Sequence, residues 1–292
     1  MFTAESTKVT LREACEAVGL DPTDAHLMRL GTNAVFRLAA SVVVRIARLD
    51  SLDEMIRTVR VARWLESVDY PAVRALTFKQ PVVIDGSAAT FWEALSDGET
   101  YASVPEVAEL LRRLHSLAAP NDVKLPVFEP FGRIDKRLEK SKWLTDSDRQ
   151  FLEGLLAKLR EQYRRLNFAL APGVIHGDAN VGNVLRDEQG RPAVIDLDSF
   201  AVGPREWDLI QTAIFYDRFG WHTREEYESF VDIYGFDIMK WPGYSVLRDI
   251  RELHMVSWLT LNITDDDMLA EEARKRIESI RTDSGWREWQ PY

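Results

Sequence analysis

The sequence predicts an α+β protein that divides near residue 95 into a strand-rich first part and a mainly helical second part. In the first part, short apolar runs alternate with turn residues, and one longer stretch over residues 52–67 has apolar residues at helical spacing. From about residue 104 onward helical spacing dominates, and the segment over residues 172–196 interrupts it with the pattern of a strand, a loop and a hairpin. We therefore expect two domains, residues 1–95 and residues 96–292.

The first part should contain strands on either side of one prominent helix. A helix that ends at Gly19 opens the chain, with Thr10 and Glu13 as its capping box. The turn pair Asp85 and Gly86 joins the last two strands. The strands are expected over residues 27–30, 34–38, 42–46, 81–84 and 90–92.

The most informative motif is His176-Gly177-Asp178, followed by Asn183 and then by Asp196. Phosphoryl transfer needs an acceptor hydroxyl aimed in line at the phosphorus, and it needs the charge on the phosphate oxygens neutralised. The carboxylate of Asp178 suits the first task, and the hard oxygen ligands of Asn183 and Asp196 suit Mg²⁺ for the second. The alternative is that Asp178 and Asp196 each cap a turn, but the ordered set favours the chemical role.

The residues around Asp196 have the pattern of an antiparallel hairpin. Residues 183–186 and 193–196 form its strands, which places Asn183 opposite Asp196. Asp198 points to the same face of the strand as Asp196 if the second strand continues. There it either assists the metal or has a solvated or capping role.

The segment from His176 to Asp208 resembles the aminoglycoside phosphotransferase and choline kinase superfamily, which consists of small-molecule kinases with a protein-kinase-like fold. The resemblance implies that Asp178 orients the acceptor, that His176 holds the catalytic loop, and that Asp208 supports the loop without touching substrate. The matching motifs are H-G-D-x-x-x-x-N, I-D, and G-P with a downstream Asp, formed by His176, Gly177, Asp178, Asn183, Ile195, Asp196, Gly203, Pro204 and Asp208.

The same resemblance implies a two-lobed architecture. Residues 1–95 would form a small, mainly antiparallel β lobe with one main helix, which binds the nucleotide and includes the hinge. Residues 96–292 would form a larger, mainly helical lobe that carries the catalytic loop, the β-hairpin and the acceptor site.

Two segments of the small lobe are candidates for contact with the nucleotide. Gly31, Thr32 and Asn33 lie where the family places its phosphate-covering loop, although an ordinary hairpin turn would look the same. The hinge would be formed by Trp92, Glu93 and Ala94, whose backbone groups would bind the purine. Because backbone groups do not identify the base, ATP is expected and GTP is not excluded.

Arg45 lies on the third strand, where kinases carry the lysine that contacts the α- and β-phosphates. An arginine can fork onto phosphate oxygens, although a surface arginine on a half-buried strand is the alternative. The carboxylate that pairs with this cation normally comes from the next helix, whose middle positions here are Thr58 and Val59. Glu54, near the start of that helix, is therefore the candidate partner, and it departs from the family pattern.

The acceptor site should be formed by the last third of the chain, where helices rich in Trp and Tyr also carry acidic residues. Carboxylates flanked by aromatic rings could bind an amino sugar. The alternative is that most of these carboxylates form solvated helix faces. Tyr216, Asp217 and Trp221 are the candidate acceptor contacts.

Composition excludes few function classes. The chain has 292 residues and a net charge of −10, which argues against binding to nucleic acid or to anionic membranes. The single cysteine excludes an intrachain disulfide, and no signal peptide or membrane-spanning run is predicted. We expect a cytoplasmic protein, a monomer or a homodimer, whose partner is a small molecule with a hydroxyl group.

The predicted function is Mg²⁺-dependent transfer of the ATP γ-phosphate to a hydroxyl of a small molecule. An aminoglycoside or another antibiotic is the leading acceptor, which would make the protein a resistance enzyme. A metabolite kinase that acts on an amino sugar, a choline-like alcohol or methylthioribose is the closest alternative. A catalytically silent nucleotide-binding protein and a metal-dependent hydrolase using Asp196 and Asp198 are the alternatives from other classes.

Overall fold

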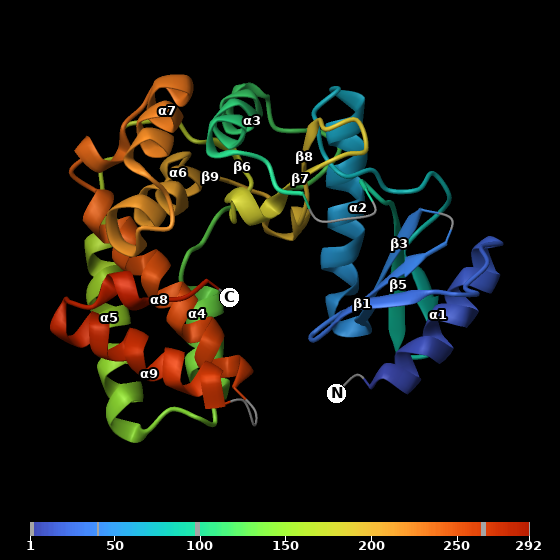
Figure 1. Cartoon of the computed structure of the whole chain (residues 1–292), viewed down its shortest axis with the longest axis horizontal. Helices are drawn as coiled ribbons and strands as arrows, with labels where there is room; N and C mark the ends of the chain where they lie inside the picture. The colour runs from blue at the N-terminus through green and yellow to red at the C-terminus, as the bar shows by residue number, and fades with distance from the viewer. Residues whose placement is uncertain (1–2, 40, 97–99, 264–266, 292) are drawn as a thin grey trace. The chain divides into compact units, whose positions relative to one another are not determined.

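The structure, a computed structural model, describes residues 3–39, 41–96, 100–263 and 267–291 (Figure 1). The chain forms two compact units. Unit 1 consists of Met1–Pro126 and Val181–Ala201, and unit 2 consists of Val127–Asn180 and Val202–Tyr292. Unit 1 thus extends past the boundary predicted at residue 95 and includes the hairpin that follows the catalytic loop. The functional division into lobes stays a prediction.

Unit 1 is built around a five-stranded sheet in the order β1-β2-β3-β5-β4 (Figure 1). Every neighbouring pair in this sheet is antiparallel. The strands agree closely with the apolar runs of the sequence, and β5 starts a few residues earlier than expected. They are β1 (His26–Leu30), β2 (Ala34–Leu38), β3 (Val42–Arg48), β4 (Val82–Ile84) and β5 (Ser87–Glu93).

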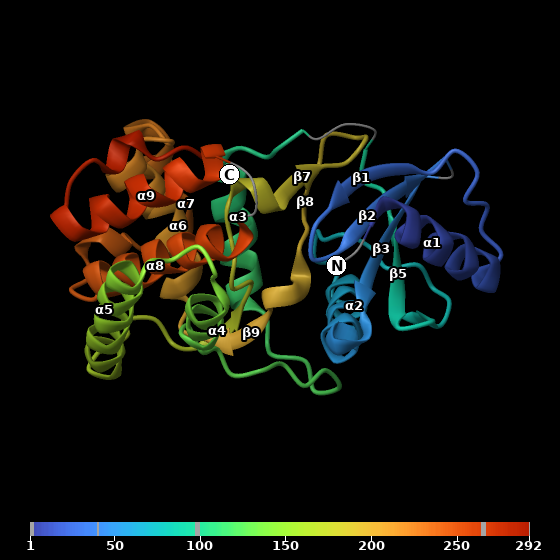
Figure 2. The ribbon, with the colours of Figure 1, turned by 90° about the horizontal axis from the view of Figure 1, so that it is seen from below.

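Helix α1 (Ala4–Val18) packs against this sheet through Leu11 and Cys15, which are buried with the strand residue Phe36 (Figure 2). The helix begins earlier than predicted, because Thr3 and Ser6 form the capping box. Its end agrees with the prediction, since Gly19 has φ +72 and caps the last carbonyls.

Two further helices belong to unit 1. Helix α2 (Leu52–Ser67) follows the 3₁₀ turn η1 (Leu49–Ser51) and buries Met55, Val59 and Leu65, as the helical spacing predicted. Helix α3 (Val104–Ser116) has a capping box formed by Ser103 and Glu106. Arg186 in the hairpin pairs with Glu106 at 2.5 Å, so α3 and the hairpin are joined within unit 1.

The hairpin of β7 (Val184–Arg186) and β8 (Pro192–Val194) has a register one residue away from the expected one. Val184 pairs with Val194, and the Ile195 N–H donates to the Asn183 carbonyl at 2.9 Å. Asn183 therefore lies opposite Ile195 and not opposite Asp196. The reason is the loop over residues 187–191, which is centred on Gln189 and makes Arg186 pair with Pro192, and this fixes the register of both strands. The 3₁₀ turn η2 (Val181–Asn183) precedes β7, which therefore starts one residue later than predicted.

Unit 2 is mainly helical, with α8 in contact with α4, α5, α6 and α9 (Figures 1 and 2). Leu247, Ile250 and Leu253 of α8 are fully buried, which makes this helix the centre of the unit's core. Strands β6 and β9 form a short two-stranded sheet. The elements are α4 (Gly132–Lys140), α5 (Asp146–Arg164), β6 (Gly173–Ile175), β9 (Ala201–Gly203), α6 (Glu206–Ile214), the π-helical turn η4 (Phe215–Phe219), α7 (Arg224–Tyr234), η5 (Ile238–Lys240), α8 (Tyr244–Asn262), α9 (Asp267–Thr282) and η6 (Trp286–Glu288).

Within the described residues, none of the helices combines the length and the apolar character needed to cross a membrane.

Candidate active site

Asp208 anchors the loop that carries Asp178. It lies in the first turn of α6 and is fully buried. Its Oδ2 accepts the His176 N–H at 2.7 Å, and its Oδ1 accepts the Gly177 N–H at 2.8 Å. Hydrogen bonds from two consecutive backbone groups to one carboxylate are charge-assisted and fix the course of the loop. These contacts support the structural role proposed for Asp208.

The conformation of the loop depends on Gly177 and His176. Gly177 has φ +83, in the left-handed region that favours glycine, and its carbonyl accepts the indole N–H of Trp207 at 2.9 Å. His176 is buried, and its Nδ1 accepts the Asp178 N–H at 3.2 Å. This bond to the backbone supports a loop-holding role for His176, and the role of base stays a prediction for Asp178.

Arg251, which lies on α8, forms an ion pair with the Asp178 carboxylate. The same guanidinium donates to the Gln211 amide oxygen and lies over the ring of Trp207, 5.5 Å from its centroid. The side chain of Arg251 is 10% exposed, whereas that of Asp178 is 38% exposed. Asp178 is thus held by a buried cation and remains accessible to a small molecule.

The residues proposed to hold the metal lie in unit 1. Asp196 has φ +54, a conformation uncommon for a residue with a side chain and concentrated at functional sites. The 3₁₀ turn η3 (Leu197–Ser199) follows it directly, so the strand does not continue to Asp198 as the sequence predicted. Asp196 and Asn183 together supply a carboxylate and an amide oxygen.

These two oxygen donors fit Mg²⁺, which usually takes one or two carboxylates and completes its shell with phosphate oxygens and water. Among the residues that the structure describes, no group of three or more His, Cys, Asp or Glu side chains is arranged to hold a metal ion. A site formed by Asn183 and Asp196 would therefore depend on the nucleotide phosphates for its remaining ligands.

Arg45 has a different partner from the predicted Glu54. Its Nη2 lies 2.5 Å from Asp198 Oδ2, and the Thr58 hydroxyl donates to Asp198 Oδ1 at 2.9 Å. Glu54 instead contributes to the negative charge around Arg45. Burial by itself lowers the pKa of Arg45, but hydrogen bonding to Asp198 and the charges of Asp198, Asp196 and Glu54 outweigh it and raise that pKa.

The observed partner of Arg45 differs from the predicted one because of the positions along α2. Glu54 lies in the first turn of this helix, whereas the buried residue one turn further along is Thr58, which has no charge. Asp198 therefore supplies the carboxylate that the middle of α2 lacks. Since both oxygens of Asp198 already have partners, this contact favours an anchoring role over the proposed metal-assisting role.

The loop over residues 31–33 is connected to Arg45. In the amide orientation that satisfies its hydrogen bonds, Asn33 Oδ1 accepts from Arg45 Nη2 at 2.6 Å and from Nε at 3.0 Å, and its nitrogen donates to the Thr32 carbonyl. The Gly31 N–H donates to the Asn33 carbonyl at 3.0 Å. A phosphate-binding role for this loop stays a prediction, now with Asn33 placed beside the candidate phosphate-binding cation.

The hinge candidates make backbone bonds within unit 1. The Glu93 N–H donates to the Arg74 carbonyl and the Ala94 N–H donates to the Ser41 carbonyl, both at 2.9 Å. Trp92 is buried, and its indole N–H donates to the Thr90 hydroxyl. Purine binding through this segment stays a prediction, and the two N–H groups of Glu93 and Ala94 would need to exchange their present partners to take part.

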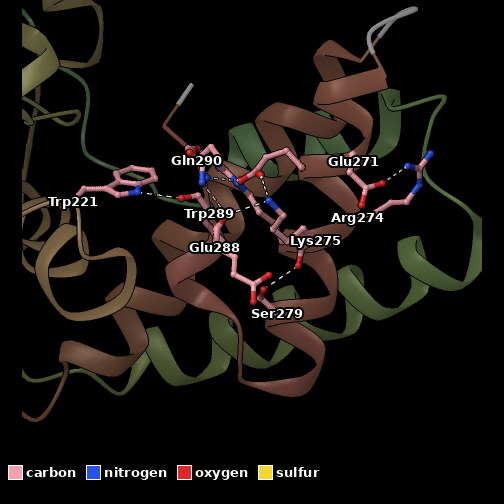
Figure 3. Close-up of polar contacts among 10 residues, drawn as sticks. Trp221, Glu271, Arg274, Lys275, Ser279, Glu288, Trp289 and Gln290 are labelled. Carbon is pink, nitrogen blue, oxygen red and sulfur yellow. Dashed lines mark hydrogen bonds and ion pairs between the residues drawn. The ribbon is translucent and has the colours of Figure 1, made fainter.

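The three candidate acceptor residues all have contacts inside unit 2. The Tyr216 ring stacks on Tyr227 with a centroid distance of 5.1 Å. Asp217 accepts the Tyr244 hydroxyl at 2.9 Å. Trp221 donates its indole N–H to the Trp289 carbonyl at 3.1 Å, which joins it to the C-terminal segment (Figure 3). These contacts explain their positions by packing, and an acceptor role for them stays a prediction.

The sequence did not identify the polar residues around Asp178. Arg251 and His254 follow Leu247 at helical spacing, so both lie on the face of α8 that carries the core leucines. A charged residue and a histidine in phase with an apolar stripe are a signal that sequence inspection could have found. Gln211 and Arg137 have no comparable signal, because their proximity to Arg251 depends on how the helices pack.

Comparison with known proteins gives the family. Residues 30–250 match the model of the phosphotransferase enzyme family, so this chain belongs to that family and is a phosphotransferase. The resemblance inferred from the H-G-D and I-D motifs is thereby confirmed. No curated protein matches this chain.

Several solved structures have the same kinase-like fold, which confirms the predicted fold class. The amicoumacin kinase hAmiN in complex with AMP-PNP, Ca²⁺ and Ami has a TM-score of 0.75 at 12% identity, over 99% of this chain and 98% of that chain. Aminoglycoside phosphotransferase APH(3'')-Id from Streptomyces rimosus has a TM-score of 0.63 at 22% identity, over 84% and 97%. A choline/ethanolamine kinase family protein from Mesorhizobium loti has a TM-score of 0.65 at 17% identity, over 97% and 96%.

Proposed function

We propose that this phosphotransferase moves the γ-phosphate of ATP, with Mg²⁺, to a hydroxyl of a small molecule. The observation that carries the proposal is the Asp178 carboxylate, which is partly exposed on a loop fixed by buried Asp208. A carboxylate placed in this way can accept a proton from an alcohol without losing its position. Similar structures contain AMP-PNP, ADP or GDP, which supports a nucleoside triphosphate donor.

In the proposed step, the acceptor oxygen forms a bond to the γ-phosphorus while the bond from that phosphorus to the β–γ bridging oxygen breaks. The acceptor proton passes to Asp178, and ADP leaves with the bridging oxygen. Asn183 and Asp196 would hold Mg²⁺, which neutralises charge on the phosphate oxygens. Arg45, fixed by Asp198 and Asn33, would bind phosphate oxygens through its guanidinium.

The acceptor predicted from the sequence, an aminoglycoside or another antibiotic, remains one candidate, and a metabolite remains the other. Similar structures include phosphotransferases in complex with spectinomycin, streptomycin and kanamycin, and a choline kinase. These likenesses support a small polar acceptor with a hydroxyl group.

The test is release of ADP from ATP with and without acceptor, measured for the wild type and for Asp178→Ala. We expect the variant to lose acceptor-dependent ADP release by about 10²–10⁴-fold while it still binds Mg·ATP. Asp232→Ala, which removes an exposed carboxylate from α7, is the matched control and should keep full activity. Full transfer activity in Asp178→Ala would show that Asp178 is not the base.

A further inference from the structure

Three arginines lie near one another in unit 2, and one of them contacts the candidate base. We call them the arginine cluster: Arg133 and Arg137 of α4, and Arg251 of α8. Arg251 contacts Asp178 directly. Arg137 Nη1 donates to the His254 carbonyl at 3.3 Å, one turn of α8 from Arg251. The cluster brings more positive charge to the catalytic carboxylate than one ion pair requires.

Arg251 is not fully satisfied by its contacts. Its Nη2 bonds both Asp178 and Gln211, whereas its Nε is buried and has no acceptor among the residues that the structure describes. A buried donor without an acceptor is unfavourable, and more so when the group is charged. The guanidinium of Arg251 therefore has hydrogen-bonding capacity that its present partners do not use.

Arg137 lacks a compensating carboxylate of its own. Its hydrogen-bond partners are neutral, the carbonyl and the Nδ1 of His254, and within the described ranges it forms no ion pair. Burial and the positive charges of Arg133 and Arg251 lower its pKa to about 10, and Asp178 only partly opposes them. The group remains charged at neutral pH, so its burial is a cost that a bound anion would offset.

His254 does not neutralise or add to this charge. Its Nε2 faces the Pro130 carbonyl and its Nδ1 faces Arg137 at 3.5 Å, so the neutral form protonated on Nε2 satisfies both contacts. Burial, followed by the charges of Arg251 and Arg137, lowers its pKa to about 3. The ring therefore presents a lone pair to Arg137 and no charge.

Three acidic residues near the cluster in sequence have arginine partners outside it. The pairs are Glu252 with Arg218 at 3.2 Å, Asp249 with Arg248 at 2.8 Å, and Asp135 with Arg160. Two carboxylates remain beside the cluster, Asp178, which Arg251 contacts, and buried Asp208, which holds the loop. Three guanidinium groups against these two carboxylates leave an excess of positive charge among these groups.

We infer that the hydroxyl acceptor of this enzyme carries a negative charge, a carboxylate or a phosphate group, which the arginine cluster binds beside Asp178. The inference rests on the proposed function, because it assigns the acceptor of the same site. Guanidinium groups bind both kinds of anion through paired N–H donors. A polycationic aminoglycoside would instead place ammonium groups against three arginines, which is unfavourable.

The inference also gives Arg251 a part in the reaction. In the structure its guanidinium occupies one oxygen of Asp178. An anionic acceptor could accept the hydrogen bond that Arg251 now donates to Asp178. The freed oxygen of Asp178 could then accept the hydroxyl proton. Arg251 would then be a positioning residue for Asp178 and a contact for the acceptor.

The experiment uses acceptor sets that differ mainly in charge. Binding of D-glucuronate, D-glucuronamide and D-glucosamine is measured by calorimetry without nucleotide, and glucose 6-phosphate is compared with glucose in the same way. The same compounds and kanamycin are then tested for acceptor-dependent ADP release. We expect at least one anion to bind about ten-fold or more tightly than its neutral counterpart. The carboxylate and phosphate arms distinguish the two sources of charge.

Variants connect this preference to the cluster. Arg137→Gln should remove most of the ten-fold preference for the anion, and Arg137→Lys should restore part of it. Arg224→Gln, on the exposed surface of α7, is the matched control and should leave the preference unchanged. If the glutamine variant is poorly folded by circular dichroism, Arg137→Met, which removes the same charge and keeps the apolar contacts of the side chain, supplies the comparison.

The outcomes separate the two proposals. Anions that bind no more tightly than their neutral partners, or that bind equally well to folded Arg137→Gln, would overturn the inference about charge. ADP release with kanamycin or glucosamine and with no anion would leave the kinase proposal intact and reject the anionic acceptor. Anion binding that depends on Arg137, without ADP release from any compound and with no Mg·ATP binding, would reject the kinase proposal and keep the anion site.

Discussion

Arg45 in unit 1 and Arg251 in unit 2 each pair with one aspartate, but the charges around the two arginines have opposite signs. Asp198, Asp196 and Glu54 surround Arg45 with negative charge, and its pKa is raised in spite of burial. Arg251 shares its surroundings with other arginines, and burial together with repulsion from Arg133 and Arg251 lowers the pKa of Arg137. One region therefore has an excess of carboxylates and the other an excess of guanidinium groups.

The difference shows how one residue type can serve opposite purposes. The carboxylates beside Arg45 form a region suited to a divalent cation. The guanidinium groups beside Asp178 form a region suited to an anion. The side chain of Arg45 is 24% exposed and that of Arg251 is 10% exposed, so both are largely buried, and the net charge of the surrounding groups is what distinguishes them. The predictions below test this comparison, from the largest expected effect to the smallest.

Asp196→Ala should have the largest effect. If Asp196 holds Mg²⁺, its loss should reduce the rate of phosphoryl transfer by about 10³-fold or more, because charge on the phosphate oxygens is no longer neutralised. The measurement is kcat over a range of Mg²⁺ concentrations. Asp198→Asn keeps the shape of its contacts and should reduce the rate far less. Equal losses in both variants would assign the metal to both carboxylates.

Acid should destabilise the protein through His254. Its pKa is about 3 in the folded chain and 6.5 in the reference state, so between these values the unfolded chain binds the extra proton and stability falls as the pH falls. The loss attributable to His254 should be about 1.4 kcal/mol for each pH unit below 6.5. Urea unfolding of the wild type and of His254→Gln at pH 7.5, 6.0 and 5.0, values chosen at roughly unit spacing for this titration, would measure it.

Glutamine can keep both polar contacts of His254 without titrating, so the variant should show a flatter dependence of unfolding free energy on pH. His26→Gln, which replaces the exposed histidine of β1, is the matched control and should keep the wild-type slope. If the wild type and His254→Gln lose stability in parallel, His254 is not buried in its neutral form.

Arg45→Met should destabilise unit 1. Asp198 would keep its bond to Thr58 but lose its cation while still close to Asp196 and Glu54. We expect the free energy of unfolding to fall by about 1–2 kcal/mol, because the pair is partly buried and a carboxylate loses its partner. Thermal unfolding with and without Mg²⁺ would detect the loss. A metal ion that restores the stability would confirm the excess of negative charge.

Arg137→Met should have the smallest effect and the opposite sign. Removing a buried cation that lies beside other cations relieves repulsion, and the methionine keeps the apolar contacts of the side chain. We expect no loss of stability and a gain of up to about 1 kcal/mol. Urea unfolding at pH 7 measures it, and a clear loss of stability would show that the positive charge is compensated inside unit 2.

Much of the fold could be predicted from local patterns. The strands of the sheet in unit 1 follow from short apolar runs between turn residues, and α2 follows from its helical spacing. The errors have local causes. The opening helix starts at Ala4 because Thr3 and Ser6 form a capping box ahead of the predicted one, and the hairpin register differs by one residue because its closing loop is centred on Gln189.

The site was predictable only where its residues are close in sequence. The loop with His176, Gly177 and Asp178 and its support by Asp208 follow from a compact motif, and the observed hydrogen bonds agree with that support. The partner of Arg45 was not predictable, because Asp198 is far away in the chain and reaches Arg45 through the fold of unit 1. The cluster of Arg137 and Arg251 likewise forms when α4 packs on α8.

The sequence by itself determined the class of this protein: an α+β chain with the motifs of a small-molecule kinase, a candidate base at Asp178 and oxygen ligands at Asn183 and Asp196. These features depend on periodicity and on motifs whose members are near one another in the chain. Only the tertiary structure decided which charges meet, because ion pairs such as those of Arg45 and Arg251 join residues from separate elements. The sign of the charge beside the base, and with it the inferred class of acceptor, is therefore a property of packing.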